Sequence, residues 1–407
     1  MKNQERLVCD NEFIKWFNKT TNMHTKSPLQ EAIENKDFAR AKELITEGEI
    51  FPDGMQEFNK RTLLETLIKN KAFAVLDALA EAKSIEMDLY EYDKLEGSIF
   101  EMLFRNLPTD DESLQFLKTF IAKVDNANDE VSGKTLLSHA MDVQAAPEIV
   151  QTLINAGLDT SFLNNAEDNL IQQAARLNLI ANEKQLAYID LLIKAGADVA
   201  HTNVEKQNAL HIAVERDKNH LLEKLIESGA NPNDQDQKGN SSFFYALSYK
   251  MNGEVYSKLV AGGTPDFTQQ NKEGATALSA FLRMMPGSEK DITLLEQLVD
   301  DGADLESAPP YYSNPKSGWD WIIEKPIPVM ERLLKKTKQD VNGNTLLHKV
   351  CAIDVNYSQE KAKEIYRKVK LLLETGADNT ITNTEDKTPA DIALTDNLKA
   401  KTVEILL

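Results

Sequence analysis

The chain has 407 residues, of which 42% are hydrophobic, 27% charged and 7% aromatic, and this apolar share excludes a disordered polymer. Its 17 glycines and 13 prolines are too few for a collagen-like, linker-rich or many-stranded architecture, so a mostly helical protein is expected. The net charge of −19 argues against nucleic acid and anionic membrane surfaces as partners, because binding phosphate groups requires basic patches.

The cysteines and the apolar runs narrow the class of protein further. Cys9 and Cys351 lie near opposite ends of the chain, so they form no disulfide framework and no Cys-x-x-Cys zinc pair. No apolar run resembles a cleaved signal peptide, and none approaches the roughly 18 residues of a membrane span. We therefore expect a cytoplasmic protein that does not contact the membrane, or one secreted into a host cell without a cleaved signal peptide.

The first 26 residues fit no repeating pattern. Phe13, Ile14, Trp16 and Phe17 have the spacing of one face of a helix. Because the first unit of a repeat array exposes an apolar edge, we expect this segment to be a capping helix.

From Ser27 onward, a Ser or Thr followed two residues later by an apolar residue recurs, mostly at intervals of 33–39 residues. Such a residue accepts hydrogen bonds from the exposed N–H groups at a helix start. Pro28 and Pro389 come next in their units, where a missing N–H costs nothing. The clear starts are Ser27, Thr62, Ser98, Thr135, Thr276, Thr345 and Thr388, and the weaker ones are Asn169, Asn208, Ser241 and Asp320.

A second recurring pattern, Gly-Ala-Asp or a close variant, comes late in each unit. A glycine there adopts the left-handed conformation that ends a helix. In the unit from Asn208, apolar residues at 210–214 and 221–226 predict two short helices before this glycine. The glycines are Gly157, Gly196, Gly229, Gly302 and Gly376, with weaker echoes at Gly48 and at Gly262 and Gly263.

The period, the opening step and the Gly-Ala-Asp ending resemble the ankyrin repeat. The best matches are residues 208–213 (NALHIA) with 225–231 (LIESGAN), and 343–348 (GNTLLH) with 371–378 (LLLETGAD). The resemblance covers roughly residues 27–407 and implies an all-α solenoid of about eleven helix-turn-helix units with projecting loops. It also implies that His211 and His348 hydrogen-bond neighbouring turns.

Four segments are expected. They are an N-terminal capping helix (1–26), regular and semi-regular ankyrin repeats (27–304), an irregular insertion with a short repeat (305–345), and C-terminal ankyrin repeats (346–407). The irregular segment carries Pro326 and Pro328 in a short unit, and its Trp319 and Trp321 are expected to pack onto that unit.

No catalytic, cofactor-binding or metal-ligating residue is predicted. The six histidines form no His-x-x-x-His pair, and no glycine-rich phosphate loop or Gly-x-Ser-x-Gly step occurs. Cys351 lies three residues after His348, but it falls at a small apolar position of the repeat and is expected to be a buried, inert thiol. We expect neither an enzyme nor a bound cofactor.

The resemblance implies a protein partner that binds loop tips and the concave face formed by first helices. We expect this partner to span residues 201–312, with Tyr311 and Tyr312 as an aromatic anchor. Residues 81–130 hold 13 acidic and 5 basic residues, which favours a basic partner. The expected partner-binding residues are Asn203, Glu205, Asp236, Gln237, Lys238, Gln270, Asn271, Lys272, Tyr311 and Tyr312.

The predicted function is non-catalytic protein–protein interaction by a monomer, as a bacterial effector or scaffold. Divergent ankyrin proteins of intracellular bacteria, rich in Lys, Asn and Glu, look similar. An alternative is a cytoplasmic immunity or inhibitor protein that neutralises a basic toxin or enzyme. A hypothesis of another class is an enzyme with a site hidden in residues 305–345, which would require converging polar groups of shifted pKa.

Overall fold

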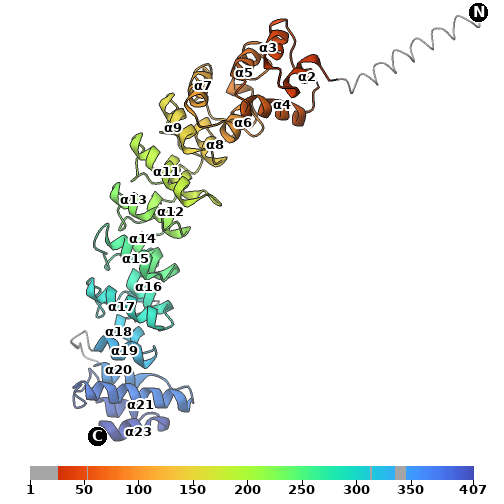
Figure 1. Ribbon diagram of the computed structural model, residues 1–407. Coiled ribbons are helices and arrows are strands. Elements are labelled where there is room, and N and C mark those ends of the chain that lie inside the picture. Colours follow the sequence, from red (N-terminus) through yellow and green to blue (C-terminus); the bar gives the residue numbers. More distant parts are fainter. Residues whose placement is uncertain (1–25, 53, 312–313, 335–344) are drawn as a thin grey trace, which may run out of the picture. The chain divides into compact units, whose positions relative to one another are not determined.

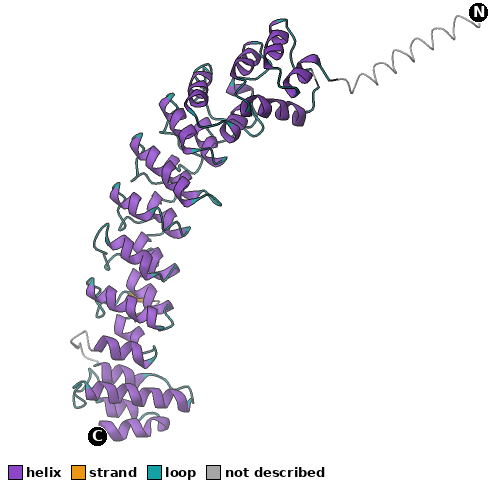
Figure 2. Ribbon diagram, in the orientation of Figure 1, coloured by secondary structure: helices purple, strands orange, loops and turns teal. Residues whose placement is uncertain are grey.

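A computed structural model describes residues 26–52, 54–311, 314–334 and 345–407 (Figure 1). The predicted capping helix therefore lies outside the described residues, apart from Lys26. Within them, helices account for nearly all regular structure, as the all-α prediction requires (Figure 2). The chain divides into two compact units, Met1–Asp198 and Val199–Leu407, which the sequence does not signal. The four predicted segments remain a proposal.

The first unit consists of short helices joined by turns. They are α2 (Pro28–Glu34), α3 (Phe38–Thr46), α4 (Glu57–Lys69), α5 (Phe73–Glu81), η2 (Leu89–Glu91), α6 (Ile99–Asn106), α7 (Asp111–Ile121), α8 (Leu136–Asp142), α9 (Pro147–Asn155), α10 (Leu170–Arg176) and α11 (Asn182–Lys194).

The second unit continues the same alternation and adds one two-stranded ladder. Its helices are α12 (Ala209–Glu215), α13 (Leu222–Glu227), α14 (Ser242–Phe244), η3 (Tyr245–Tyr249), α15 (Gly253–Val260), α16 (Ala277–Met284), α17 (Glu289–Asp300), α18 (Gly318–Ile322), α19 (Ile327–Leu334), α20 (Leu346–Ala352), α21 (Gln359–Glu374), α22 (Pro389–Ala393), η4 (Asn397–Lys399) and α23 (Ala400–Leu406). The antiparallel strands are β1 (Pro310–Tyr311) and β2 (Asn314–Pro315), with Pro310 opposite Pro315.

Helices pack by their position in the repeat. Within the first unit, the first helices α2, α4, α6, α8 and α10 contact one another in sequence, and the second helices α7, α9 and α11 do the same. The second unit repeats this with α16 against η3 and α18, and with α17, α19, α21 and α23 in a row. Each helix pair therefore buries its apolar faces against its neighbours, which gives each unit one continuous core.

Most predicted first helices begin where expected. Ser27, Thr135, Thr276 and Thr345 each accept a hydrogen bond from the backbone N–H three residues later, and Pro28 occupies the first helical position. The same capping is seen at Ser98, Asn169, Asn208, Ser241 and Thr388.

Two predicted starts are wrong. Thr62 lies inside α4, because residues 57–61 contain no helix breaker and the helix begins before it; its hydroxyl donates to the Phe58 carbonyl. In the irregular repeat the cap is Ser317, and Asp320 is the third helical residue, whose carboxylate accepts from the Ser317 N–H. This Ser–Asp pair is a capping box.

The predicted closing glycines have the left-handed backbone. Gly229 has φ +104°, and its N–H and that of Ala230 donate to Ile226 and Leu225 of α13. Gly262 has no positive φ. A Cβ there would lie 2.6 Å from Cγ2 of Ile226, so close packing rather than backbone conformation favours glycine. The other glycines with left-handed φ at helix ends are Gly48, Gly157, Gly196, Gly302 and Gly376.

Polar side chains cross from one repeat to the carbonyl groups that end the preceding first helix. Lys399, only 4% exposed, donates from Nζ to the Cys351 carbonyl at 2.8 Å, and Lys368 donates to the Ile323 carbonyl at 2.8 Å. In the first unit, Gln185 of α11 makes a similar bond within one repeat, donating to the Ala174 carbonyl at the end of α10 at 2.8 Å. These bonds satisfy helix-end carbonyls that would otherwise be buried without partners.

Replacing Gly229 with Ala should lower the free energy of unfolding by about 1 kcal/mol or more, because a Cβ disfavours the left-handed conformation. No atom lies within 4 Å of the added Cβ, so the cost comes from the backbone alone. Gly253→Ala is the control: Gly253 begins α15 without a positive φ, and stability should be unchanged or higher. Equal denaturation midpoints for the two variants would contradict this account.

Lys399→Met should cost about 1–3 kcal/mol, because it leaves the Cys351 carbonyl buried without a donor. Lys401→Met removes the same charge from an exposed position of α23 and should cost much less. Chemical denaturation measures both. A Lys399 variant as stable as the Lys401 variant would show that this bond is not needed.

Candidate partner-binding surface

Three consecutive loops of the second unit share one backbone geometry. In residues 203–207, 236–240 and 271–275, the first residue donates its N–H to the carbonyl of the fifth and accepts from the N–H of the fourth. The fourth residues Lys206, Gly239 and Gly274 have φ between 56° and 79°. Each loop is thus a tight hairpin with one left-handed residue.

The first side chain of each hairpin fixes this geometry. Oδ1 of Asn203 accepts from two backbone N–H groups of its own loop, as does Oδ1 of Asp236 and of Asn271. The Tyr245 hydroxyl donates to the other oxygen of Asp236 at 2.6 Å. Asn and Asp are favoured here because their short side chains bond the following backbone.

Backbone hydrogen bonds also join each hairpin to the next. The Gln237 N–H donates to the Glu205 carbonyl at 2.7 Å, and the Lys272 N–H donates to the Lys238 carbonyl at 2.9 Å. The Asn271 amide donates to Oδ1 of Asn240 at 3.1 Å. The three hairpins therefore lie side by side as one connected surface, which we call the hairpin strip (residues 203–207, 236–240 and 271–275).

The structure brings eight of the ten predicted partner-binding residues onto this strip or directly beside it. Glu205, Gln237, Lys238, Gln270 and Lys272 are exposed, and Asn271 is half-buried. Asn203 and Asp236 are only 5% and 6% exposed, and both side chains hold their own loops.

The backbone of Tyr311 belongs to β1, opposite Asn314. Tyr312 lies outside the described residues. Trp319 and Trp321 are 2% and 7% exposed and pack into the irregular repeat, as expected from the sequence.

Two buried histidines contact the carbonyl groups of neighbouring loops. Nε2 of His211 lies 2.9 Å from the Asp234 carbonyl in the next repeat, and burial lowers the His211 pKa. Nε2 of His348 lies 2.9 Å from the Lys387 carbonyl. Both histidines therefore contact neighbouring turns, as the family resemblance implies.

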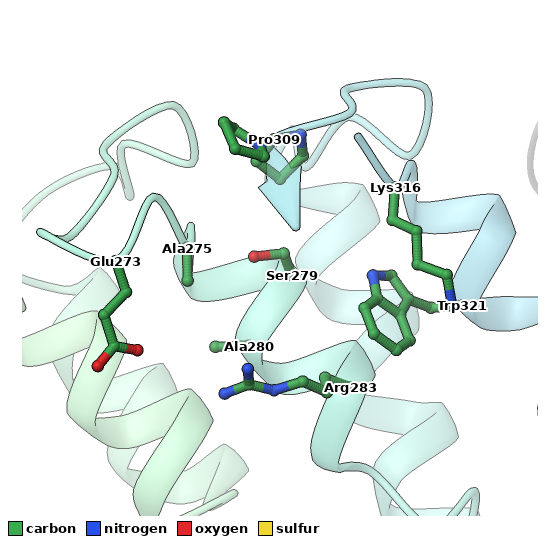
Figure 3. Close-up of a pocket in the computed structure, with 9 residues that line it drawn as sticks. Glu273, Ala275, Ser279, Ala280, Arg283, Pro309, Lys316 and Trp321 are labelled. Atoms are coloured by element: carbon green, nitrogen blue, oxygen red, sulfur yellow. The ribbon is translucent and has the colours of Figure 1, made fainter. Parts of the chain in front are cut away.

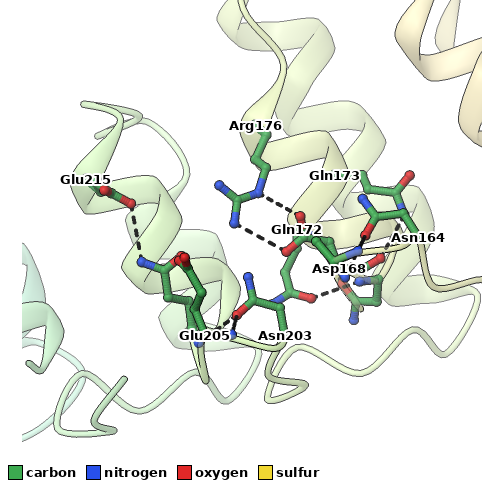
Figure 4. Close-up of polar contacts among 11 residues, drawn as sticks. Asn164, Asp168, Gln172, Gln173, Arg176, Asn203, Glu205 and Glu215 are labelled. Atoms are coloured by element: carbon green, nitrogen blue, oxygen red, sulfur yellow. Dashed lines mark hydrogen bonds and ion pairs between the residues drawn. The ribbon is translucent and has the colours of Figure 1, made fainter. Parts of the chain in front are cut away.

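A second recurring interaction joins several of the loops to the first helix that follows them. The residue before the N-cap pairs with the residue eight positions later, near the helix end. In the first unit Arg176 donates to both oxygens of Asp168, at 2.8 and 3.3 Å; in the second, Gln207 donates to Glu215 at 3.3 Å (Figure 4). The further pairs are Lys26–Glu34, Lys134–Asp142 and Lys316–Glu324.

A pocket of about 430 Å³ lies beside the strip in the second unit, where α16, β1 and α18 meet. Pro309 and Trp321 form apolar walls, and Nζ of Lys316 lies 3.9 Å from the Trp321 ring centroid. In Figure 3 the Glu273 carboxylate and the Arg283 guanidinium reach toward one another across the pocket. The sequence does not predict this pocket, because its walls come from different repeats.

Ser279 and Cys351, on either side of the irregular segment, carry groups that can act as nucleophiles. The Ser279 hydroxyl in the pocket donates to the Thr276 carbonyl and accepts from the Thr276 N–H, within its helix cap. Burial raises the pKa of the Cys351 thiol to about 12, so this thiol is protonated at neutral pH. Within the described ranges, no group of three or more His, Cys, Asp or Glu residues is arranged to hold a metal ion.

Comparison with known proteins agrees with this architecture. Residues 177–271 match the family model described as ankyrin repeats (3 copies). Similar curated proteins are the E3 ubiquitin-protein ligase KEG of Arabidopsis thaliana (27% identical, over 46% of this chain and 12% of that protein), an ankyrin repeat protein of fowlpox virus (28%, over 32% and 38%), and NF-kappa-B inhibitor delta of Mus musculus (26%, over 42% and 58%). The chain thus spans less than two thirds of each.

The comparison with solved structures includes the ankyrin repeat domain of Bcl-3, a member of the IkappaB protein family. It is 20% identical, with a TM-score of 0.45, and the match covers 59% of this chain and 98% of that one.

The stacked helix pairs and hairpin loops define a repeat protein built from helix-turn-helix units. Residues 177–271 match the ankyrin-repeat family, and the same helix-turn-helix unit recurs before and after them in the described residues. Ankyrin repeats are protein–protein interaction modules. None of the helices in the described part of the chain has the length and apolar character needed to cross a bilayer.

One buried histidine leads to a pH-dependence prediction. His139 in α8 is 1% exposed, and neither ring nitrogen has a hydrogen-bond partner among the described residues. Burial, with a smaller contribution from Lys134, lowers its pKa; the acids Glu96, Glu101 and Asp142 oppose this. The unfolded chain therefore binds this proton at a higher pH than the folded chain does.

Stability should accordingly fall as the pH decreases below about 6.5, the pKa of an unfolded histidine. His139→Leu removes this proton and should flatten the decline between pH 7.5 and 5.5. Denaturation midpoints at several pH values measure it. Parallel pH profiles for the wild type and the variant would contradict the assignment.

Proposed function

We propose that this chain is a non-catalytic recognition protein that binds a protein partner through the hairpin strip and the adjoining surface of the first helices. The observation that carries the proposal is the set of backbone hydrogen bonds between hairpins, such as Lys272 N–H to the Lys238 carbonyl. Because these bonds hold the strip in one conformation, little conformational entropy is lost when a partner binds.

The chemistry of the strip supports a polar contact. Its outward side chains are Glu205, Gln237, Lys238, Gln270 and Lys272, and none of them belongs to the core. A polar strip of this kind requires an apolar or aromatic anchor nearby for high affinity. Tyr311 and Tyr312 remain our proposed anchor on the sequence evidence.

The acidic stretch 81–130 supports a partner with a basic surface. Some of its acids are paired within the chain, as Glu101 is with Arg105. Others surround an open groove of about 880 Å³ in the first unit, where Tyr90 is 87% exposed. The acids Glu81, Glu86, Asp88, Glu91 and Asp125 line that groove.

Two biological roles are proposed for this binding. A scaffold or effector role requires only that the partner binds. The alternative, an inhibitor or immunity protein, requires that binding blocks the partner, and the mouse relative is by name an inhibitor. Assaying the partner's own activity with and without this chain separates the two roles, and we expect the chain to act in the cytoplasm as a monomer.

The strip can be tested by truncating two exposed side chains. Lys238→Ala combined with Lys272→Ala should weaken partner binding at least about tenfold, because both side chains are exposed at neighbouring hairpin tips and their contacts with the partner are lost. Lys36→Ala combined with Lys401→Ala makes the same charge change at other exposed positions and should have little effect. A partner is first isolated by affinity capture and identified by mass spectrometry, and its Kd is then measured for each variant. Equal loss in both double variants would assign the effect to net charge.

The acidic stretch gives a kinetic prediction. Raising the salt concentration from about 20 mM to about 150 mM should slow association with a basic partner several-fold. Glu86→Gln with Glu91→Gln should reduce this salt dependence. Association rates are measured by stopped flow. If they do not respond to salt, the acidic residues serve solubility and do not steer association.

A further inference from the structure

The pocket beside the hairpin strip contains an arginine without an internal partner. Arg283 is exposed at the end of α16, and among the described residues its guanidinium forms no ion pair. The chain carries a net charge of −19, so carboxylates outnumber cations. Most other arginines in the described residues form an ion pair with a carboxylate. Arg40, Arg61, Arg105, Arg176 and Arg332 are all paired.

The repeat pattern explains why Arg283 is unpaired. An arginine at the same helix position, Arg176, pairs with Asp168, eight residues earlier. Arg105, again at this position, pairs instead with Glu101, four residues earlier. In α16 the residues eight and four positions before Arg283 are Ala275 and Ser279, so neither carboxylate is present.

These two small residues also create the pocket. Ala275, Ser279 and Ala280 line it, and the space left by the missing carboxylates opens between Arg283 and the apolar walls of Pro309 and Trp321 (Figure 3). Its volume, about 430 Å³, lies in the range of ligand-binding pockets. A planar guanidinium favours a carboxylate, which it binds through two parallel N–H donors.

We propose that this pocket binds an acidic side chain of a partner segment, whose carboxylate takes the place that Asp168 occupies beside Arg176. An apolar residue next to the acidic one packs against Trp321 and Pro309. The proposal rests on the proposed function, since a segment lying on the hairpin strip reaches the pocket at Glu273, in the last hairpin. Such a segment continues on both sides, so the carboxylate comes from a side chain.

The test uses the full chain and blocked peptides as probes. Acetyl-Ala-Phe-Glu-Ala-amide carries a side-chain carboxylate, acetyl-Ala-Phe-Gln-Ala-amide carries none, and acetyl-Ala-Phe-Gln-Ala with a free C-terminus carries only a terminal one. The indole N–H signal of Trp321 in a ¹⁵N-labelled protein, assigned with Trp321→Phe, reports binding. The Glu peptide should bind at least about fivefold more tightly than either Gln peptide, as expected for a charge-assisted guanidinium contact.

Two variants remove the site in different ways. Arg283→Gln removes the cation, whereas Ala275→Asp keeps it and supplies an internal carboxylate like that of Asp168. Both should abolish the preference for the Glu peptide. Arg216→Gln, which removes another exposed arginine in the second unit, should leave the preference unchanged.

Three results would overturn the proposal: equal binding of the Glu and blocked Gln peptides, a preference that survives Arg283→Gln, or tighter binding of the free C-terminal peptide. None of these results bears on the proposal that the hairpin strip binds a partner, which the Lys238 and Lys272 variants test separately. If those variants lose partner binding while the Glu and Gln peptides bind equally well, the strip proposal stands and the pocket proposal is rejected.

Discussion

The interaction on which this structure depends is the hydrogen bond from one repeat to the backbone of the next. No helix pair can bury its apolar face alone, so neighbouring pairs must stack and enclose backbone groups at their borders. Lys399 satisfies a helix-end carbonyl in this way, and His211 lies against a loop carbonyl. Between hairpins, Lys272 donates to Lys238 directly. Stacking therefore fixes the projecting loops as well as the core.

The fixed geometry of the hairpin strip follows from that constraint. Residues such as Gln237 and Lys238 are polar and exposed, yet their backbone is held on both sides by neighbouring hairpins. Pairs such as Asp168–Arg176 and Gln207–Glu215 anchor some of the loops to the helix that follows. Where this pair is absent, at Ala275 and Arg283, an unpaired charge and a pocket result. A binding site can thus arise from the omission of one repeated contact.

The sequence predicts those features that are determined locally. Ser27 caps a helix and Gly229 ends one because each acts within a few residues of itself. The prediction for Thr62 is wrong because cap residues also occur inside helices. The polar character of Asn203 and Asp236 predicts contact with a partner; the structure adds that their side chains shape the hairpins, and polarity alone does not distinguish these roles. The sequence does hold a signal for the pocket: Ala275 and Ser279 stand where other repeats place the carboxylate that pairs with the first-helix arginine.

The most direct test of this account is amide hydrogen exchange at Gln237 and Lys272 in the free protein. Both N–H groups lie in exposed hairpins, and both donate to the carbonyl of the preceding hairpin. If the hairpins form one fixed strip, these two amides should exchange at least about a hundredfold more slowly than in an unstructured chain, in step with the helices beneath them. Exchange at the unstructured rate would contradict the account, because the strip would then not be preformed.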